Sequence, residues 1–396
     1  METLKSLSIY SGDKLRTFRG NKEVGAALCC AAFFIVSYFA LSFSSFNQTL
    51  LPEQMRSLIF GMDDDDAKVM PLIPPSQYEE NSPQYEENLK EVFEKAAMPD
   101  RTVIITTLNA AWAENNTMID IFLESFRHGD GTQRLLQHLI IICLDQKAYN
   151  RCLETHPHCL KVITDGIDFS GEQALLSHDY IKMIWRRINF LETVLEMNYN
   201  FVFTDADVIW FRDPFSLLRH DSKADMQIAC DRFNGRPWDV RNSPNAGFTY
   251  VRANEKTLTF YKYWYSERRR SSKMADQEVF NAIKREDTFK SIGMNLRFLD
   301  TQHFGGFCGI RFTDMAKAYT MHANCCKGLS AKLNDLRTIL DDWKNWQQRP
   351  LETSPVSFET SIHDKGGGKR SQGSRDEVSG LHFSVPRACK KSMRKH

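Results

Sequence analysis

The chain has no excess of charge of either sign. Its 51 Lys and Arg residues nearly balance its 50 Asp and Glu residues, which leaves a net charge of +1 over 396 residues. It has no basic stripe interleaved with aromatic residues, a pattern that single-strand nucleic-acid binders use. The 10 cysteines include no Cys-x-x-Cys pair and no Cys/His spacing of a zinc site. A nucleic-acid partner and a zinc site are therefore not expected.

Charge is also missing from residues 24–46, a run of apolar and small side chains. A helix rising 1.5 Å per residue over this length is long enough to cross a bilayer core of about 30 Å. The alternative is a cleaved signal peptide, whose apolar region is shorter, about 7–15 residues. Basic residues in 1–23 place the N-terminus in the cytoplasm. We therefore expect a cytoplasmic tail at 1–23, a single transmembrane signal anchor at 24–46, and the remainder in the lumen of the secretory pathway.

Residues 47–98 are expected to form a lumenal stem, because proline and acidic residues favour an extended chain. The acidic run Asp63–Asp66 lacks the alternating spacing and the glycine of an EF-hand, so it is interpreted as a solvated linker. Apolar positions within Leu89–Met98 predict a short amphipathic helix that leads into the globular part.

Three further features concern the lumenal side. Asn115 begins an Asn-Asn-Thr sequon, a predicted glycosylation site. Residues 349–396 are rich in Pro, Ser and Gly and predict a mobile C-terminal tail, although Leu381–Val385 and Cys389 could dock back. The eight cysteines after the anchor form an even set, and in a lumenal compartment several could be paired, Cys152 with Cys159 first.

Between residues 99 and 348 apolar runs of strand length alternate with amphipathic segments of helix length. Buried strands are predicted at 102–108, 139–144, 160–163, 201–207, 226–230, 247–251, 296–300 and 319–322. Helices are predicted at 119–126, 177–197, 256–264, 277–283 and 331–346. Strands that alternate with helices favour right-handed parallel crossovers. The expected fold is therefore one α/β domain at 99–348 with a mostly parallel, Rossmann-like sheet flanked by helices.

The strand at residues 201–204 ends in two carboxylates, Asp205 and Asp207. Side chains two residues apart on a strand point the same way. Ligands bind at the carboxyl ends of strands in open α/β sheets, and paired hard oxygen ligands suit Mn²⁺ or Mg²⁺. The alternative is a solvated acidic turn. A second apolar run, 208–211, follows at once and favours a metal site at the sheet edge.

A third metal ligand is expected from an imidazole, and His322 is the candidate because it ends the short strand 319–322. The alternative is a hydrogen-bonded loop histidine. Lys327 supplies charge, and Gly328 permits close backbone approach to a phosphate. A divalent ion bridging two phosphates would stabilise the charge on a nucleoside diphosphate leaving group. The pattern therefore points to transfer of a sugar from a nucleotide sugar.

Five motifs together resemble the plant nucleotide-diphospho-sugar transferases, a glycosyltransferase family 77-like group. That group includes rhamnogalacturonan-II xylosyltransferases and extensin arabinosyltransferases. The motifs occupy residues 102–109, 200–215, 245–248, 276–281 and 321–328. The resemblance implies a GT-A fold and a type II Golgi membrane protein. It also implies Mn-dependent, retaining transfer from a UDP-sugar to a polysaccharide or hydroxyproline-rich glycoprotein.

The resemblance also implies roles for single residues. It assigns metal binding to Asp205, Asp207 and His322. It assigns the nucleotide base and ribose to Thr106, Leu108 and Asn109. The sugar site is assigned to Asn245 and Gly247, and the catalytic polar pair beside the donor sugar to Asp276 and Gln277. The alternatives are purely structural roles: Asn245 could cap a turn, and Asp276 could be the N-cap of a helix. Lys182 could reach the donor from the helix before the metal strand, the alternative being a solvated helix face.

No residue is an unambiguous nucleophile, so we expect front-face attack with the departing phosphate as base and Asp276 orienting the sugar. The donor sugar is expected to be a pentose or galactose. An aspartyl-phosphate phosphatase is disfavoured, because its Asp-x-Asp follows the first strand of the domain and here the strand lies mid-domain. The remaining alternative is a non-catalytic, membrane-anchored partner of other glycosyltransferases that keeps the fold.

Overall fold

The computed structural model describes residues 82–162, 164, 167–173, 176–270, 274–310, 313–349 and 382–394. The predicted cytoplasmic tail, membrane anchor and most of the stem lie outside these residues, as do residues 350–381 of the predicted tail. Among the helices that the structure describes, none is long and apolar enough to cross a membrane.

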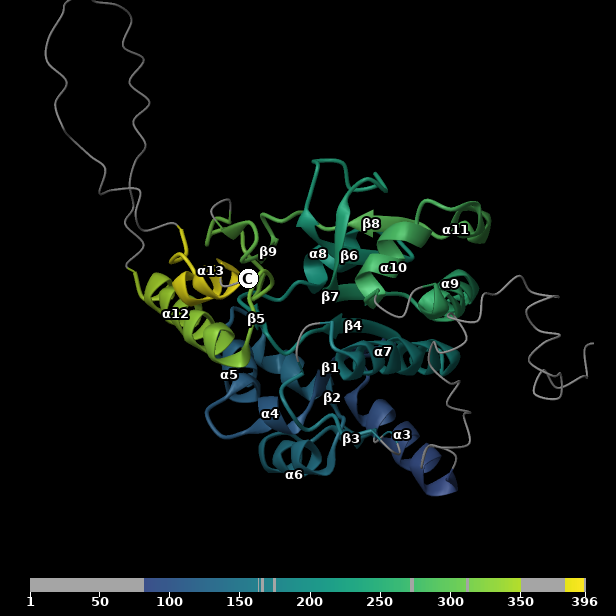
Figure 1. The fold of residues 1–396 in the computed structure, drawn as a ribbon, viewed down its shortest axis with the longest axis horizontal. Helices are drawn as coiled ribbons and strands as arrows, with labels where there is room; N and C mark the ends of the chain where they lie inside the picture. Colours follow the sequence, from purple (N-terminus) through teal and green to yellow (C-terminus); the bar gives the residue numbers. More distant parts are fainter. Residues whose placement is uncertain are drawn as a thin grey trace, which may run out of the picture. The chain divides into compact units, whose positions relative to one another are not determined.

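A seven-stranded sheet forms the centre of the domain, in the order β3-β2-β1-β4-β7-β6-β8 (Figure 1). Its strands are β1 Thr102–Leu108, β2 Leu139–Cys143, β3 Cys159–Lys161, β4 Asn200–Thr204, β6 Met226–Arg232, β7 Ser243–Val251 and β8 Leu296–Phe298. β7 runs antiparallel to both β4 and β6, and the other neighbouring pairs are parallel. The predicted mostly parallel sheet is confirmed, with one reversed strand in its middle.

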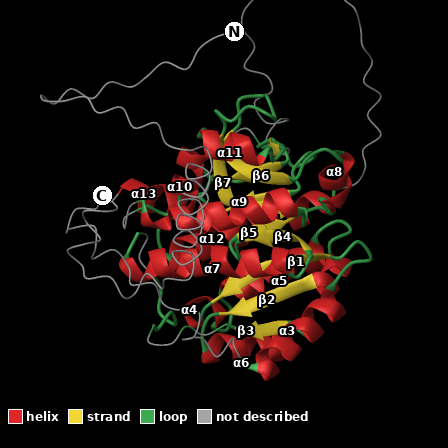
Figure 2. Cartoon of the chain, turned by 90° about the vertical axis from the view of Figure 1, so that its right-hand side faces the viewer, coloured by secondary structure: helices red, strands yellow, loops and turns green. Residues whose placement is uncertain are grey.

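Both faces of the sheet are covered, because alternate side chains of each strand enter different clusters. Val103 and Ile105 join one buried cluster, whereas Ile104 and Leu108 join the other. The first face packs against α3 Pro83–Ala96, α7 His178–Glu196, α9 Glu255–Ser266, α10 Asp276–Ile283 and α11 Asp287–Ile292, and Figure 2 shows α7 and α9 across it. The second packs against α4 Ala110–Ala113, α5 Met118–His128, α6 Gln146–Thr155 and α8 Phe215–His220. Short 3₁₀ turns lie at Gln133–His138 and Glu267–Arg269.

A second, three-stranded sheet stands at the carboxyl edge of the first. It has the order β5-β10-β9, with β5 Val208–Trp210, β9 Phe304–Gly306 and β10 Thr320–His322. β10 is antiparallel to β5, and His322 is the register partner of Val208. The pairing therefore brings the late segment of the chain against the residue that directly follows Asp207.

The C-terminal part closes on this small sheet. Helix α12, Leu329–Gln347, and helix α13, Arg387–Arg394, share a third buried cluster with residues of β5 and β10. Cys389 is buried and forms a disulfide with Cys326. The docking that the sequence left open for Cys389 thus occurs, and the tail predicted from residue 349 must be corrected to include a docked segment at 382–394.

Two more disulfides are present. The expected pair Cys152–Cys159 is confirmed, and Cys308 pairs with Cys325. Cys143 and Cys230 are buried and free.

The helix expected at 89–98 is longer and begins at Pro83, where the Ser82 side chain accepts the N–H of Tyr85. Its inner face is part of the domain core: Phe93 is fully buried and packs edge-on against Tyr199, with ring centroids 5.1 Å apart. The globular unit therefore begins before residue 99, because α3 covers apolar surface that the sheet would otherwise expose.

We predict that Phe93→Ala lowers the free energy of unfolding by about 3–5 kcal/mol, the usual penalty for deleting a buried aromatic ring. Urea denaturation measures it, with the exposed Glu94→Ala on the same helix as the control. A stability equal to that of the control would show that α3 is not part of the folded unit.

Candidate metal centre

Asp205, Asp207 and His322 lie together at the junction of the two sheets. One ligand atom from each falls within 4.8 Å of the others. The Nε2 atom of His322 lies 3.2 Å from Asp207 Oδ1 and 3.7 Å from Asp205 Oδ2. Asp207 is 2 % exposed. Two carboxylates and one imidazole at this spacing suit a divalent cation, with positions left for water or phosphate oxygens.

Buried charge in this centre is balanced by cations. Burial opposes ionisation of Asp207, but Lys332 and His322 outweigh it and lower its pKa. Burial raises the pKa of Asp205, against the nearby guanidinium of Arg187. Burial alone would lower the pKa of His322, but the carboxylates, Asp207 foremost, raise it. The centre is thus arranged to hold positive charge between its carboxylates.

Arg187 links the metal centre to a third carboxylate. It projects from α7, donates to Asp205 Oδ1 at 2.8 Å and forms an ion pair with Asp276 Oδ2. Asp276 is the first residue of α10, and Ala275 is the N-cap. Asp276 is therefore not the helix N-cap that the sequence analysis gave as the alternative. Its side chain is buried and pairs with Arg187. Trp264 Nε1 donates to its backbone carbonyl at 2.9 Å.

Lys332 on α12 donates to Asp207 Oδ2 at 2.6 Å. A divalent ion held by Asp207 would compete with this ammonium group, because both need the same carboxylate. Lys332 would then be available to meet the negative charge of a ligand that accompanies the ion.

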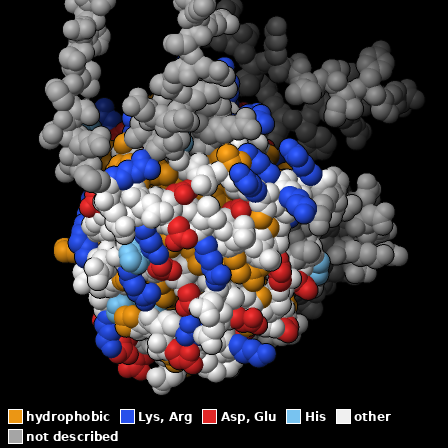
Figure 3. Space-filling model, turned by 90° about the vertical axis from the view of Figure 1, so that its left-hand side faces the viewer, with side chains coloured by type: hydrophobic (Ala, Val, Ile, Leu, Met, Phe, Trp, Pro, Cys, Tyr) orange, Lys and Arg blue, Asp and Glu red, His pale blue; other side chains and the backbone are white. Residues whose placement is uncertain are grey.

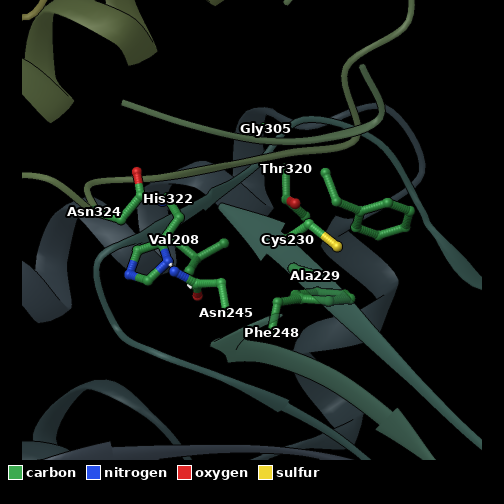
Figure 4. A pocket seen from close by; sticks show the side chains of 10 residues that line it. Val208, Ala229, Cys230, Asn245, Phe248, Gly305, Thr320, His322 and Asn324 are labelled. Carbon is green, nitrogen blue, oxygen red and sulfur yellow. Dashed lines mark hydrogen bonds between the residues drawn. The ribbon is translucent and has the colours of Figure 1, made fainter. Parts of the chain in front are cut away.

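The orientation of His322 is set by Asn245 on β7 (Figure 4). The amide of Asn245 is fixed because Nδ2 donates to Asp231 at 2.8 Å and Oδ1 accepts the N–H of Gly247 at 3.0 Å. That Oδ1 lies 3.0 Å from His322 Nδ1 and can only accept, so Nδ1 carries the hydrogen. The Nε2 atom is thereby left to face the carboxylates and a metal.

Gly247 is required for this close approach. A Cβ atom at this position would lie 2.6 Å from Asp205 Oδ2 and would collide with the ring of His322. The structure thus places Asn245 and Gly247, predicted for the sugar site, directly behind the metal ligands.

Asp231, at the end of β6, joins several polar side chains. One carboxylate oxygen accepts from Asn245 and from Asn324, both at 2.8 Å, and the other accepts from Gln277 at 3.1 Å. Gln277 also accepts the N–H of Ala246 through Oε1 at 3.0 Å. Gln277 therefore holds β7 and Asp231 in place, next to Asp276.

The predicted nucleotide residues lie at the end of β1 but offer little exposed side-chain surface. Thr106 and Leu108 are at most 1 % exposed. Asn109 caps α4 and donates to the carbonyls of Phe169 and Gly171, each at 2.9 Å. A nucleotide at this strand end would meet the backbone and the loop that Asn109 supports.

The other predicted positions lie around the centre or apart from it. Lys327 is half-buried, and Gly328, at φ +86°, precedes α12. Lys182 on α7 pairs with Asp179 at 3.6 Å, and its side chain is 20 % exposed. Asn115 is exposed in the turn between α4 and α5, as a glycosylation site requires.

Arg187, Asp231 and Lys332 were not identified from the sequence. Asp231 ends a strand, the same signal that identified Asp205. Arg187 is spaced three residues from buried Ile184 and four from buried Leu191, so it lies on the inner side of α7. Lys332 carries no comparable signal, because its role depends on how α12 docks.

The chain belongs to the nucleotide-diphospho-sugar transferase family, whose model matches residues 134–336. It is therefore a glycosyltransferase by family, as the resemblance of its motifs implied.

An uncharacterized protein of Arabidopsis thaliana is 48 % identical over 66 % of this chain and 70 % of its own length. The UDP-D-xylose:L-fucose alpha-1,3-D-xylosyltransferase 3 of Arabidopsis thaliana is 24 % identical over 40 % of this chain and 46 % of its own length. Among solved structures, mouse xyloside xylosyltransferase 1 matches with a TM-score of 0.35 at 11 % identity, over 57 % of this chain and 98 % of that one.

We predict that Asn245→Leu weakens Mn²⁺ binding about 10–100-fold, because the supporting hydrogen bond to His322 is lost. Isothermal titration measures the affinity, and exposed Asn150→Leu on α6 is the matched control. An unchanged affinity in a folded Asn245→Leu protein would contradict the role of Asn245.

We also predict that Mn²⁺ affinity falls as the pH is lowered. The raised pKa of His322 means that the ion must displace a proton from it, so the affinity rises with pH up to that pKa and then levels off. Below the pKa the loss is about tenfold per pH unit for one displaced proton. Titrations with Mn²⁺ between pH 5 and 8 test this. In the His322→Gln variant, which lacks the titrating imidazole, the dependence on this proton should be lost. Equal Mn²⁺ affinities at pH 5 and pH 8 in the unaltered protein would refute the prediction.

Proposed function

We propose that the protein transfers a pentose or galactose from a UDP-sugar to a cell-wall polysaccharide or glycoprotein, with retention of configuration and with Mn²⁺ or Mg²⁺ bound. The observation that carries the proposal is the convergence of Asp205, Asp207 and His322 at one edge of the sheet in a chain of this family. The xylosyltransferase among its relatives supports a UDP-linked donor, since its name states UDP-D-xylose.

The three ligands would hold the metal, whose bound charge would stabilise the diphosphate as it leaves. Lys332, released from Asp207, would add a positive charge on the same side. Lys327 and the N-terminus of α12 after Gly328 would lie along the diphosphate as further partners.

Transfer with retention follows from attack on the face that the diphosphate leaves. The bond between the anomeric carbon and the phosphate oxygen breaks, and a bond from the acceptor oxygen to that carbon forms. The acceptor's proton passes to the departing phosphate oxygen. Asp276, held by Arg187, would orient the sugar hydroxyls and stabilise positive charge on the ring.

The proposed location is the Golgi membrane, with one span at 24–46 and the catalytic domain in the lumen. The uncharged run and its basic preface support it. The three disulfides also support an oxidising compartment.

We predict that a screen of UDP-sugars with the purified chain and Mn²⁺ yields UDP release from at least one donor. Asp205→Asn and Asp276→Asn should each reduce the rate about 10²–10³-fold, the usual effect of removing one electrostatic stabiliser. Exposed Asp287→Asn on α11 is the control.

A negative result of the donor screen would also be informative. A chain that neither releases UDP from any common donor nor binds UDP with Mn²⁺ would instead be the non-catalytic partner. Full activity of Asp276→Asn would remove that residue from the mechanism while leaving the metal centre in place.

A further inference from the structure

Helix α13 carries four cations and no carboxylate: Arg387, Lys390, Lys391 and Arg394. At about 100° per residue these four lie within roughly 100° of one another around the helix axis, on the side opposite Cys389. Arg387, Lys391 and Arg394 are exposed and Lys390 is half-exposed. We call this set the basic face of α13.

The charge of the basic face is uncompensated within the described part of the chain, where none of the four cations forms an ion pair with a carboxylate. Two acidic residues of α12 contact the segment 382–394, but they accept hydrogen bonds from its backbone and from Ser384 and not from the four cations. Asp335 is buried and accepts the N–H groups of Ala388 and Cys389. Asp342 accepts from the backbone and hydroxyl of Ser384. With a net charge of +1 for the whole chain, this local excess is not a general property of the surface.

Helix α13 is anchored next to the metal-centre segment through its other side, which leaves the basic face outward. The disulfide Cys326–Cys389 attaches α13 to the segment that follows His322, and the N–H of Lys327 donates to Ser392 Oγ at 3.0 Å. The Sγ atom of Cys389 also lies near the carbonyl of Ala331, the residue before Lys332 in α12. Figure 3 views the side on which α12 and α13 lie in Figure 1, and Lys and Arg side chains gather at its upper right.

We propose that the basic face of α13 binds the acceptor and that the acceptor is a carboxylate-bearing glycan, an inference that rests on the proposed function. An acceptor hydroxyl must reach the metal centre, so a polymer that presents it runs over the adjoining surface. Arg and Lys side chains in a row pair with successive uronate carboxylates, while a neutral chain gains nothing from them. An anionic lipid surface is the competing occupant; the covalent link of α13 to the metal-centre segment favours the acceptor.

Binding of polygalacturonate to the purified full chain tests the inference, with fully methyl-esterified polygalacturonate of equal length as the uncharged probe. We expect binding of the charged polymer only, weakened by salt. The quadruple variant Arg387→Gln, Lys390→Gln, Lys391→Gln, Arg394→Gln should bind it at least about tenfold more weakly, since four exposed pairs are lost. The double variant Lys90→Gln, Lys223→Gln removes exposed lysines elsewhere and is the matched control. Biolayer interferometry measures each affinity, and circular dichroism checks folding.

Three outcomes would overturn the inference: equal binding of both polymers, an unchanged affinity in the quadruple variant, or loss in that variant of binding to phosphatidylserine vesicles but not to polygalacturonate. UDP–Mn²⁺ affinity, measured in parallel, should be equal in all variants. Charge-dependent glycan binding that is lost in the quadruple variant supports the inference even in a chain that binds no UDP, a result that would count against the proposed function alone.

Discussion

The central physical constraint is the burial of carboxylates at one junction of two sheets. Asp207 and Asp276 are almost fully buried, and Arg187 pairs with both Asp205 and Asp276. Ionised carboxylates removed from water require cations or a metal close by, because the desolvation penalty is otherwise several kcal/mol per ion. The domain supplies Arg187 from α7, Lys332 from α12 and His322 from β10. A divalent ion would take over part of this compensation, so folding and ligand binding use the same charges.

This constraint explains why distant segments meet. β10 pairs with β5 so that His322 stands against Val208, and Gly247 is small enough to let its ring approach Asp205. Asp231 then fixes Asn245, which fixes the hydrogen on His322. The disulfides Cys308–Cys325 and Cys326–Cys389 hold the segment after His322 on both sides. The metal centre is thus built on strands and cross-linked segments, which suits a site that must keep its geometry while substrates change.

The sequence alone predicted most strands and the three residues that converge in the candidate metal centre, for a physical reason: apolar runs mark buried strands, and polar residues at their carboxyl ends mark the edge where ligands bind. Its limits have a physical reason too. Helical spacing places Arg187 on the inner side of α7, but its two carboxylate partners lie 18 and 89 residues away and are brought together only by the fold. Thr106 and Leu108, predicted for the nucleotide, are both buried, and Leu108 shares a cluster with residues of α4 and α5. Docking of α12 and α13 depends on a disulfide partner that spacing does not identify.

The most direct test of the metal centre is an anomalous-scattering difference map from crystals grown with MnCl₂ and UDP. We expect one strong manganese peak bound by Asp205, Asp207 and His322 Nε2, with diphosphate oxygens completing its shell and Lys332 moved from Asp207 to the diphosphate. Manganese bound elsewhere, or UDP bound with the ion pair of Lys332 and Asp207 intact and no metal between the carboxylates, would contradict it.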